Sequence, residues 1–233
     1  MNRSFLLILC SVICAFAMNA QIIKSVESTP DDYILLLEAN GYESHAFDIS
    51  SLSDSRYKLS FKILEYANGE KVSENLNFSM PINNMRLVSD FREEDQAKIK
   101  PEDMDVPERG IYTLAKRFSI GFAPADNDST KRIVINVEGM GTRSGLLDMK
   151  PIIDPNSGKS FHIYGTRAFK TTEIKTGEFI PLVLFGSYWL DKEFSIFRFC
   201  GENELSADLS DYLTKSVPYF YIIGVQIEPS SKN

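Results

Sequence analysis

The residues of this sequence that are most typical of a binding site form an aromatic pair, Tyr188 and Trp189, in the segment FGSYWLDKEF. Apolar runs flank this segment and charged residues follow the pair, so we expect a turn between two strands. Aromatic rings offer large apolar faces on which sugars stack. The pair is therefore typical of a platform for a glycan or a peptide. The alternative is that Trp189 closes one end of a hydrophobic core.

A second candidate lies in the polar segment PADNDST, residues 124–130. Asp126 and Asp128 alternate as in half of a calcium loop, because carboxylate oxygens suit this hard cation. No bidentate Glu and no essential Gly of such a loop is in register, so a solvated turn is the alternative interpretation. Ser129, between Asp128 and Thr130, also matches a short pattern of O-glycosylation in exported bacterial proteins.

Nucleophilic catalysis needs a nucleophile, a base and an acid, and no residue set here has that pattern. The sequence lacks a G-x-S-x-G motif and has two histidines, His45 in a turn-like segment and His162 on the polar face of SFHIYG. Cys200 follows an apolar strand, which predicts a buried, inert thiol. We therefore predict no catalytic residue, although the many carboxylates leave a glycoside hydrolase with an unidentified acid pair as an alternative.

The segment VINVEGMGTRSG resembles a dinucleotide loop but has Ser144 where the third glycine is needed. Pro151 follows closely, so no helix can present its N-terminus to a phosphate. A glycine-rich turn between strands is the better interpretation, and no cofactor is predicted.

The composition excludes several classes of protein. The chain has 233 residues, 43% of them hydrophobic, with 25 Lys and Arg against 32 Asp and Glu. An acidic chain without basic clusters argues against binding to nucleic acid. Two histidines and three cysteines are too few for most zinc sites with several ligands.

Residues 1–20 are typical of a secretory signal peptide. Arg3 precedes an apolar run, residues 5–17, and small residues end at Ala20. The run is too short to span a bilayer, and no later segment is apolar enough, so no transmembrane span is predicted. Cys10 and Cys14 lack the small preceding residue of a lipoprotein signal. We expect an exported protein, either periplasmic or at the cell surface or secreted.

After the signal the dominant period is two, which indicates strands. Residues 56–66 alternate, and Asn68-Gly69 then predicts a hairpin turn, since both residues accept positive φ. Further strands are expected at residues 33–38, 71–80, 85–91, 112–122, 131–138, 160–164, 179–185, 194–200 and 218–227.

The last strand is apolar on both faces, so we expect it at the centre of a sheet. A short helix is expected at residues 207–215 with Ser206 as its cap, while residues 90–105 are expected to form a solvated loop, with one helical turn as the alternative. This pattern predicts an all-β fold, an antiparallel β-sandwich or jelly roll with one or two short helices. We expect one domain, residues 21–233, with a split into two small β domains near 124–130 as the alternative.

The signal ending at Ala20, the acidic mature chain and the ending PYFYIIGVQIEP resemble secreted domain-of-unknown-function proteins of Bacteroides-type gut bacteria. Residues 45–66 resemble the opening strands of galactose-binding-like jelly rolls, where a D-I-S turn precedes a long Y-x-L-x-F strand. The first resemblance implies export and a fold but no activity, and no functional residue follows from either.

Together these observations predict an exported, non-enzymatic binding module. A glycan of the cell envelope is the first expected partner, bound through Tyr188 and Trp189 if they are exposed. The alternatives are a protein-interaction or assembly module of the envelope and a glycoside hydrolase.

Overall fold

A computed structural model describes residues 27–75, 81–170 and 173–230. The predicted signal, residues 1–20 with Cys10 and Cys14, lies outside the described residues. The chain divides into two compact units, Met1–Leu36 and Leu37–Asn233. Helix α2 (Pro30–Ala39) begins in the first unit and ends in the second.

Helix α2 corrects the strand predicted at residues 33–38. The run YILLL is continuous rather than alternating, and leucine has a high helix propensity. Pro30 is the first residue of the helix, where its fixed φ is favourable and its missing N–H costs nothing. Tyr33 and Leu35 are both more than half exposed, at 59% and 65%.

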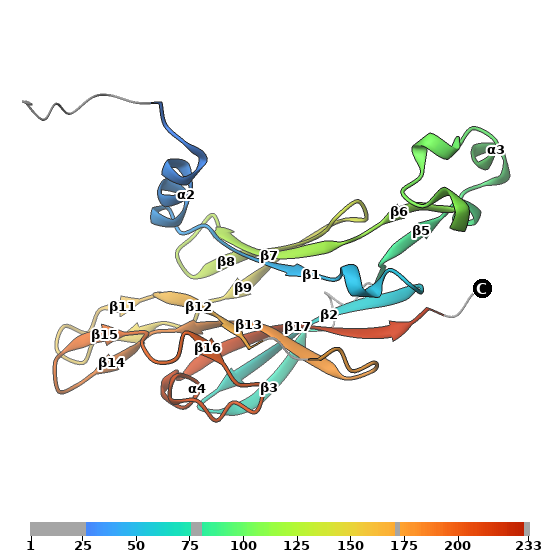
Figure 1. The fold of residues 1–233 in the computed structure, drawn as a ribbon. Helices are drawn as coiled ribbons and strands as arrows, with labels where there is room; N and C mark the ends of the chain where they lie inside the picture. The colour runs from blue at the N-terminus through green and yellow to red at the C-terminus, as the bar shows by residue number, and fades with distance from the viewer. Residues whose placement is uncertain (1–26, 76–80, 171–172, 231–233) are drawn as a thin grey trace, which may run out of the picture. The chain divides into compact units, whose positions relative to one another are not determined.

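The second unit contains two facing sheets that form an all-β sandwich (Figure 1). The four-stranded sheet is antiparallel, with its strands in the order Glu43–Asp48 (β1), Arg117–Pro124 (β7), Thr130–Val137 (β8) and Gly141–Asp148 (β9). The seven-stranded sheet contains Glu204–Leu205 (β16), Tyr164–Phe169 (β12), Phe179–Ser187 (β13), Tyr219–Pro229 (β17), Tyr57–Ala67 (β2) and Glu70–Asn75 (β3) in that order, and Ile82–Asn83 (β4) also pairs with β2. The predicted fold class is confirmed.

Three small ribbons complete the strand pairing of the described residues. They are Met85–Leu87 (β5) with Ile111–Leu114 (β6), Ile152–Ile153 (β10) with Ser160–Phe161 (β11), and Trp189–Asp191 (β14) with Ile196–Arg198 (β15).

The hairpin predicted at Asn68-Gly69 is confirmed. It joins β2 to β3, and both residues have positive φ, 51° and 82°. Residues 76–80 of the predicted return strand lie outside the described residues. The central position of the last strand is also confirmed, because β17 lies between β13 and β2 and is buried on both faces. One face contributes to the main core between the sheets, and the other faces a second cluster on the outside.

Strands β1 and β9 were not predicted. Both are edge strands of the four-stranded sheet, and their outward positions are exposed. β9 reads GTRSGLLD and β1 reads ESHAFD, so polar residues and glycine obscure the alternation. The glycine-rich segment VINVEGMGTRSG forms the β8–β9 hairpin, with Gly139 and Gly141 at positive φ, as expected for a turn between strands.

The helix predicted at residues 207–215 is shorter than expected and starts later. It is α4 (Tyr212–Ser216), and its N-cap is Asp211 rather than Ser206. The Asp211 carboxylate accepts a hydrogen bond from the backbone N–H of Ser206, which holds residues 206–211 as a loop before the helix. Leu213 anchors the helix to the second cluster.

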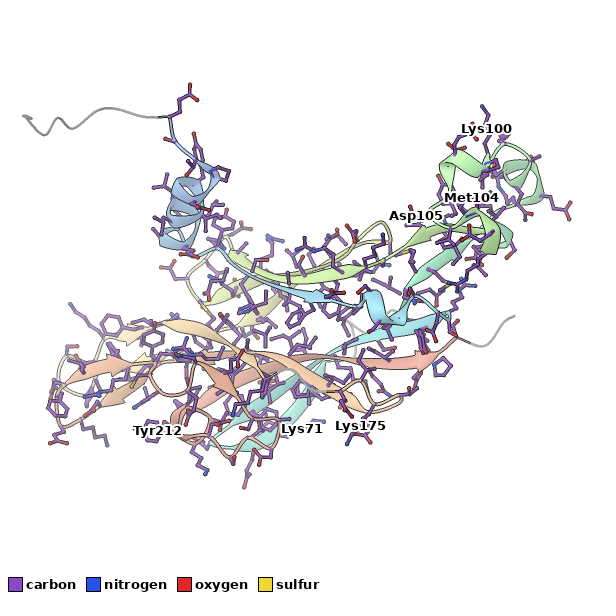
Figure 2. All side chains as sticks on the ribbon, in the orientation of Figure 1. Lys71, Lys100, Met104, Asp105, Lys175 and Tyr212 are labelled. Carbon is purple, nitrogen blue, oxygen red and sulfur yellow. The ribbon has the colours of Figure 1, made fainter. Side chains whose placement is uncertain are left out.

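Residues 88–110 leave the sandwich between β5 and β6. The segment contains α3 (Glu93–Gln96) and three single-turn helices, η3 (Val88–Asp90), η4 (Pro101–Asp103) and η5 (Pro107–Arg109). Residues 90–105, for which a solvated loop or one helical turn was expected, thus contain both α3 and η4. Lys100, Met104 and Asp105 lie on this excursion (Figure 2). A small cluster of buried Met85, Ile111 and Leu114 lies at its base.

A tyrosine cluster joins the two sheets. We use this name for Tyr219 and Tyr221 of β17 together with Glu65 of β2. The Tyr219 hydroxyl donates to the Glu65 carboxylate and lies 3.2 Å from the Tyr221 hydroxyl, which donates to the Asp148 carbonyl of β9. The two tyrosines are only 8% and 6% exposed. Burial raises the pKa of Tyr221, and the nearby Glu65 charge raises it further.

Candidate functional site

A groove with a volume of about 450 Å³ follows the edge of β12. Strand β16 pairs with β12 only at Ala168 and Phe169, so residues 164–167 have a neighbouring strand only on the β13 side. Strand β1 of the other sheet forms the facing wall of the groove. Its lining residues are Glu38, Glu43, Ser44, His45, Tyr164, Gly165, Thr166, Arg167, Tyr188 and Phe199.

Alternation along β1 presents two ionisable side chains to the groove. Glu43, His45 and Phe47 are half-buried, while the residues between them are exposed. Phe47 packs against the main core, which fixes the face on which Glu43 and His45 lie. The His45 ring rests edge-on against Phe122 at 6.4 Å between ring centroids.

The groove contains a polar cluster of Glu43, His45 and Thr166. The buried Thr166 hydroxyl donates to the Glu43 carboxylate at 2.5 Å and lies 3.0 Å from His45 Nε2. An ionised carboxylate can only accept, so the hydroxyl proton belongs to that bond and His45 Nε2–H donates to the Thr166 oxygen. Burial lowers the pKa of His45, against the opposing effect of the Glu43 charge. Neutral His45 is therefore the favoured form in this cluster.

Lys131 of β8 balances the charge of Glu43. Its ammonium group donates to the Gly41 carbonyl at 2.6 Å. Burial lowers the pKa of Lys131, while the Glu43 charge acts in the opposite direction. Glu43 therefore has a hydroxyl donor in Thr166 and a nearby cation in Lys131.

An aromatic platform lies on the other face of β12. We use this name for Tyr188 and Phe199, whose rings stack at 5.1 Å between centroids and 14° between planes. Phe199 in turn lies flat on Gly165, where a methyl group would come within 2.8 Å of the ring. Glycine at this position thus allows the ring to lie against the strand.

Arg167 completes the platform side. Its guanidinium carbon lies 5.0 Å from the centre of the Phe199 ring, within the range of a cation–π contact. It donates to the backbone carbonyls of Thr166, Phe199 and Glu202 at 2.9, 3.2 and 3.2 Å. These bonds hold both the guanidinium group and the segment that carries Phe199.

The arrangement suits binding better than nucleophilic catalysis. In a hydrolase triad the acid orients the base, whereas Glu43 here contacts Thr166 and not the imidazole of His45. The groove instead combines an aromatic face with charged and hydroxyl groups that can donate and accept hydrogen bonds. This combination is typical of sites that orient a polar ligand.

The structure separates the two residues of the predicted aromatic pair. Tyr188 lines the groove, whereas Trp189 packs against the second cluster and lies edge-on to Tyr212 at 6.1 Å. Adjacent residues of an extended chain point to opposite faces, which explains the separation. Tyr188 is thus placed at the groove and Trp189 on a different surface.

Asp126, Asp128 and Ser129 lie in the turn between β7 and β8, two neighbouring strands of one sheet. Asn127 organises this turn by accepting hydrogen bonds from the backbone and hydroxyl of Ser129 and from the Thr130 hydroxyl. Ser129 is exposed. No group of three or more His, Cys, Asp or Glu residues suited to a metal ion occurs in residues 27–75, 81–170 and 173–230.

Two predictions about reactive residues are wrong. Cys200 is exposed rather than buried. It follows β15, which pairs only with β14, so no second sheet covers it. His45 lies in strand β1 rather than in a turn. His162 is half-buried between β11 and β12.

Sequence reasoning missed most of the groove: Glu43, Thr166, Arg167 and Phe199 were not singled out. They come from three separate segments that only the sheet pairing and the β14–β15 ribbon bring together. The available signal was Gly165 within the strand sequence YGTRAF, since a glycine inside a strand often marks close approach by another group.

The comparisons with known proteins give a family but no activity. No curated protein matches the chain, and no solved structure matches it. In the described residues, no helix is both long and apolar enough to cross a membrane. A family model described as "Domain of unknown function (DUF5041)" matches residues 13–229, which is most of the chain, so the protein belongs to the DUF5041 family.

Proposed function

We propose that this protein is a non-enzymatic glycan-binding module that acts at the cell envelope after export. The observation that carries the proposal is the stacked pair of Tyr188 and Phe199 beside hydrogen-bonding groups in one groove. Envelope location is part of the proposal and rests on the signal-like residues 1–20. The resemblance of residues 45–66 to galactose-binding-like jelly rolls agrees with this function.

A sugar matches both sides of the groove. The C–H face of a pyranose ring is apolar and suits the half-buried Tyr188 ring of the platform, which lines the groove. Its hydroxyl groups both donate and accept, which suits the Glu43 carboxylate and the Arg167 guanidinium group. Within the platform, Tyr188 is packed against Phe199, which in turn lies against Gly165, so little side-chain entropy is lost when a ligand binds.

A glycan array probed with protein lacking residues 1–20 tests the proposal. We expect selective binding that falls at least about tenfold in Tyr188→Ala, because the stacking surface is lost. Tyr188→Phe keeps the ring and should retain most of the affinity. Tyr212→Ala is the matched control, since Tyr212 is 58% exposed on α4 and does not line the groove (Figure 2).

Two results of this experiment would reject the proposal. One is the absence of binding to any glycan by folded protein. The other is equal binding by the wild type and Tyr188→Ala, with both variants showing the same thermal transition.

A second candidate is a protein-interaction module, which the open edge of β12 supports. Residues 164–167 lack a neighbouring strand on the groove side, and an extended peptide can add to such an edge. A library of displayed peptides would distinguish the two functions. The protein-interaction function would be favoured if the protein selected peptides from the library and bound no glycan on the array.

Glycoside hydrolase activity can be measured on any glycan that binds. Glu38 and Glu43 both line the groove. Release of reducing ends from any bound glycan, abolished by Glu43→Gln, would replace the binding proposal with a glycosidase.

A further inference from the structure

The platform side of the groove carries a cation without a carboxylate beside it. Arg167 forms no ion pair within the described part of the chain, although it is half-buried. Its neighbours there are the Phe199 ring and backbone carbonyls. A half-buried cation of this kind is partly desolvated, so an anionic ligand would stabilise it.

Two carboxylates of this region, those of Glu202 and Glu43, are engaged elsewhere. Glu202 offers Arg167 only its backbone carbonyl, while its carboxylate accepts the N–H groups of Tyr212 and Leu213 at 3.0 and 3.2 Å. These bonds also lower the pKa of Glu202. Glu43 bonds to Thr166, whose side chain lies on the face of β12 opposite Arg167.

The guanidinium group is held in place before any ligand arrives. Carbonyls of Thr166, Phe199 and Glu202 accept from its three nitrogens. A guanidinium group carries more N–H groups than these three carbonyls take, so donors remain for a ligand. An arginine that is already ordered loses less entropy for each new hydrogen bond.

We propose that the groove selects acidic glycans, and that Arg167 recognises the carboxylate of a hexuronic acid in a glycan that also contacts Tyr188. This inference rests on the proposed glycan-binding function and names its ligand class. The planar guanidinium fork matches a carboxylate, and hydrogen bonds between two charged groups are stronger than neutral ones. A sulfated sugar offers an anion of different shape and is an outcome of the test.

The test compares each acidic oligosaccharide that binds on the array with its methyl ester, which has the same rings without the charge. We expect the ester to bind about 10- to 100-fold more weakly, the range for losing a hydrogen bond to a charged group. Affinity for the acid should also fall as salt rises, while affinity for the ester should not. This comparison needs no protein variant.

Two variants assign the effect to Arg167. Arg167→Gln should lose the preference for acid over ester, and Arg167→Lys should retain part of it. Arg198→Gln is the matched control, because Arg198 also lies over a phenylalanine ring but is paired with Asp191 at 2.7 Å. Each variant is compared at a temperature where its thermal transition shows it to be folded.

The outcomes separate this inference from the proposed function. Equal binding of acid and ester, or binding of neutral or sulfated glycans alone, overturns the acidic selectivity and leaves glycan binding intact. An array without any bound glycan overturns both.

Discussion

The polar cluster of the groove and the tyrosine cluster make the same kind of contact in different surroundings. Each joins the two sheets through hydroxyl groups, Thr166 to β1 in the groove and Tyr221 to β9 in the tyrosine cluster. Each also contains a glutamate, Glu43 or Glu65, whose carboxylate accepts a hydrogen bond from a hydroxyl group. Apolar packing supplies the rest of the contact between the sheets.

The two clusters differ in access. In the tyrosine cluster both tyrosines are almost fully buried, and only the Glu65 side chain is half-buried. In the groove the carboxylate and the imidazole are half-buried and face a hollow. The buried hydroxyl groups of the tyrosine cluster therefore serve the fold, whereas the polar cluster of the groove has groups that a ligand can reach.

The most severe test removes β17, the strand that contributes to the main core, to the second cluster and to the tyrosine cluster. A chain that ends at residue 217 lacks β17, which lies at the centre of the larger sheet. We expect no cooperative thermal transition, because the main core and the second cluster both lose a wall. Calorimetry measures this, and a cooperative transition in the shortened chain would contradict it.

The next largest effect is expected in the closed cluster. Tyr219→Phe removes the hydroxyl that donates to Glu65 while it keeps the ring. The free energy of unfolding should fall by about 1–3 kcal/mol, since the half-buried Glu65 carboxylate loses a buried donor and keeps the Ser73 hydroxyl. Glycan affinity should not change. Urea denaturation is the measurement, and unchanged stability would show that water reaches Glu65.

The matched variant in the open cluster is Thr166→Val. It leaves Glu43 and His45 without their shared hydroxyl, but water can enter the groove. We expect a smaller loss of stability than in Tyr219→Phe, about 0.5–1.5 kcal/mol, together with weaker glycan binding. If Thr166→Val lost more stability than Tyr219→Phe and kept its glycan affinity, the polar cluster would serve only the fold, as the tyrosine cluster does.

The smallest effect is the pH dependence that His45 contributes. Because burial holds its pKa in the folded state below the ordinary value of 6.5, the unfolded chain takes up the proton first as pH falls. This contribution to stability is therefore full above pH 6.5 and is lost on acidification. Urea denaturation between pH 7 and 5 measures how the free energy of unfolding falls with pH. The fall should be less steep for His45→Gln than for the wild type, by less than the equivalent of one proton per molecule. Equal pH dependence in the two proteins would show that His45 is in contact with bulk water.

Much of the fold could be predicted from local patterns. Alternation over residues 56–66, the turn at Asn68-Gly69 and the doubly apolar last strand all predicted the structure correctly, because each feature depends on neighbouring residues. The prediction at residues 33–38 was wrong because a short apolar run fits a helix as well as a strand. Edge strands β1 and β9 were missed because an edge needs less apolar surface.

The candidate site was predictable only in part. Tyr188 could be selected from its type and its polar surroundings, but the sequence does not say which of two adjacent aromatic residues faces the groove. That choice depends on the direction of the chain as it leaves β13. Arg167 and Phe199 meet across 32 residues, through a ribbon whose position no local pattern encodes.

The sequence by itself determined an all-β chain with a central last strand, because an alternation of period two and a run that is apolar on both faces report directly on burial. Only the tertiary structure decided that Glu43, Thr166, Arg167 and Tyr188 share one groove. Their proximity depends on which strand ends as an open edge and which loop folds over it, and that is a property of long-range pairing.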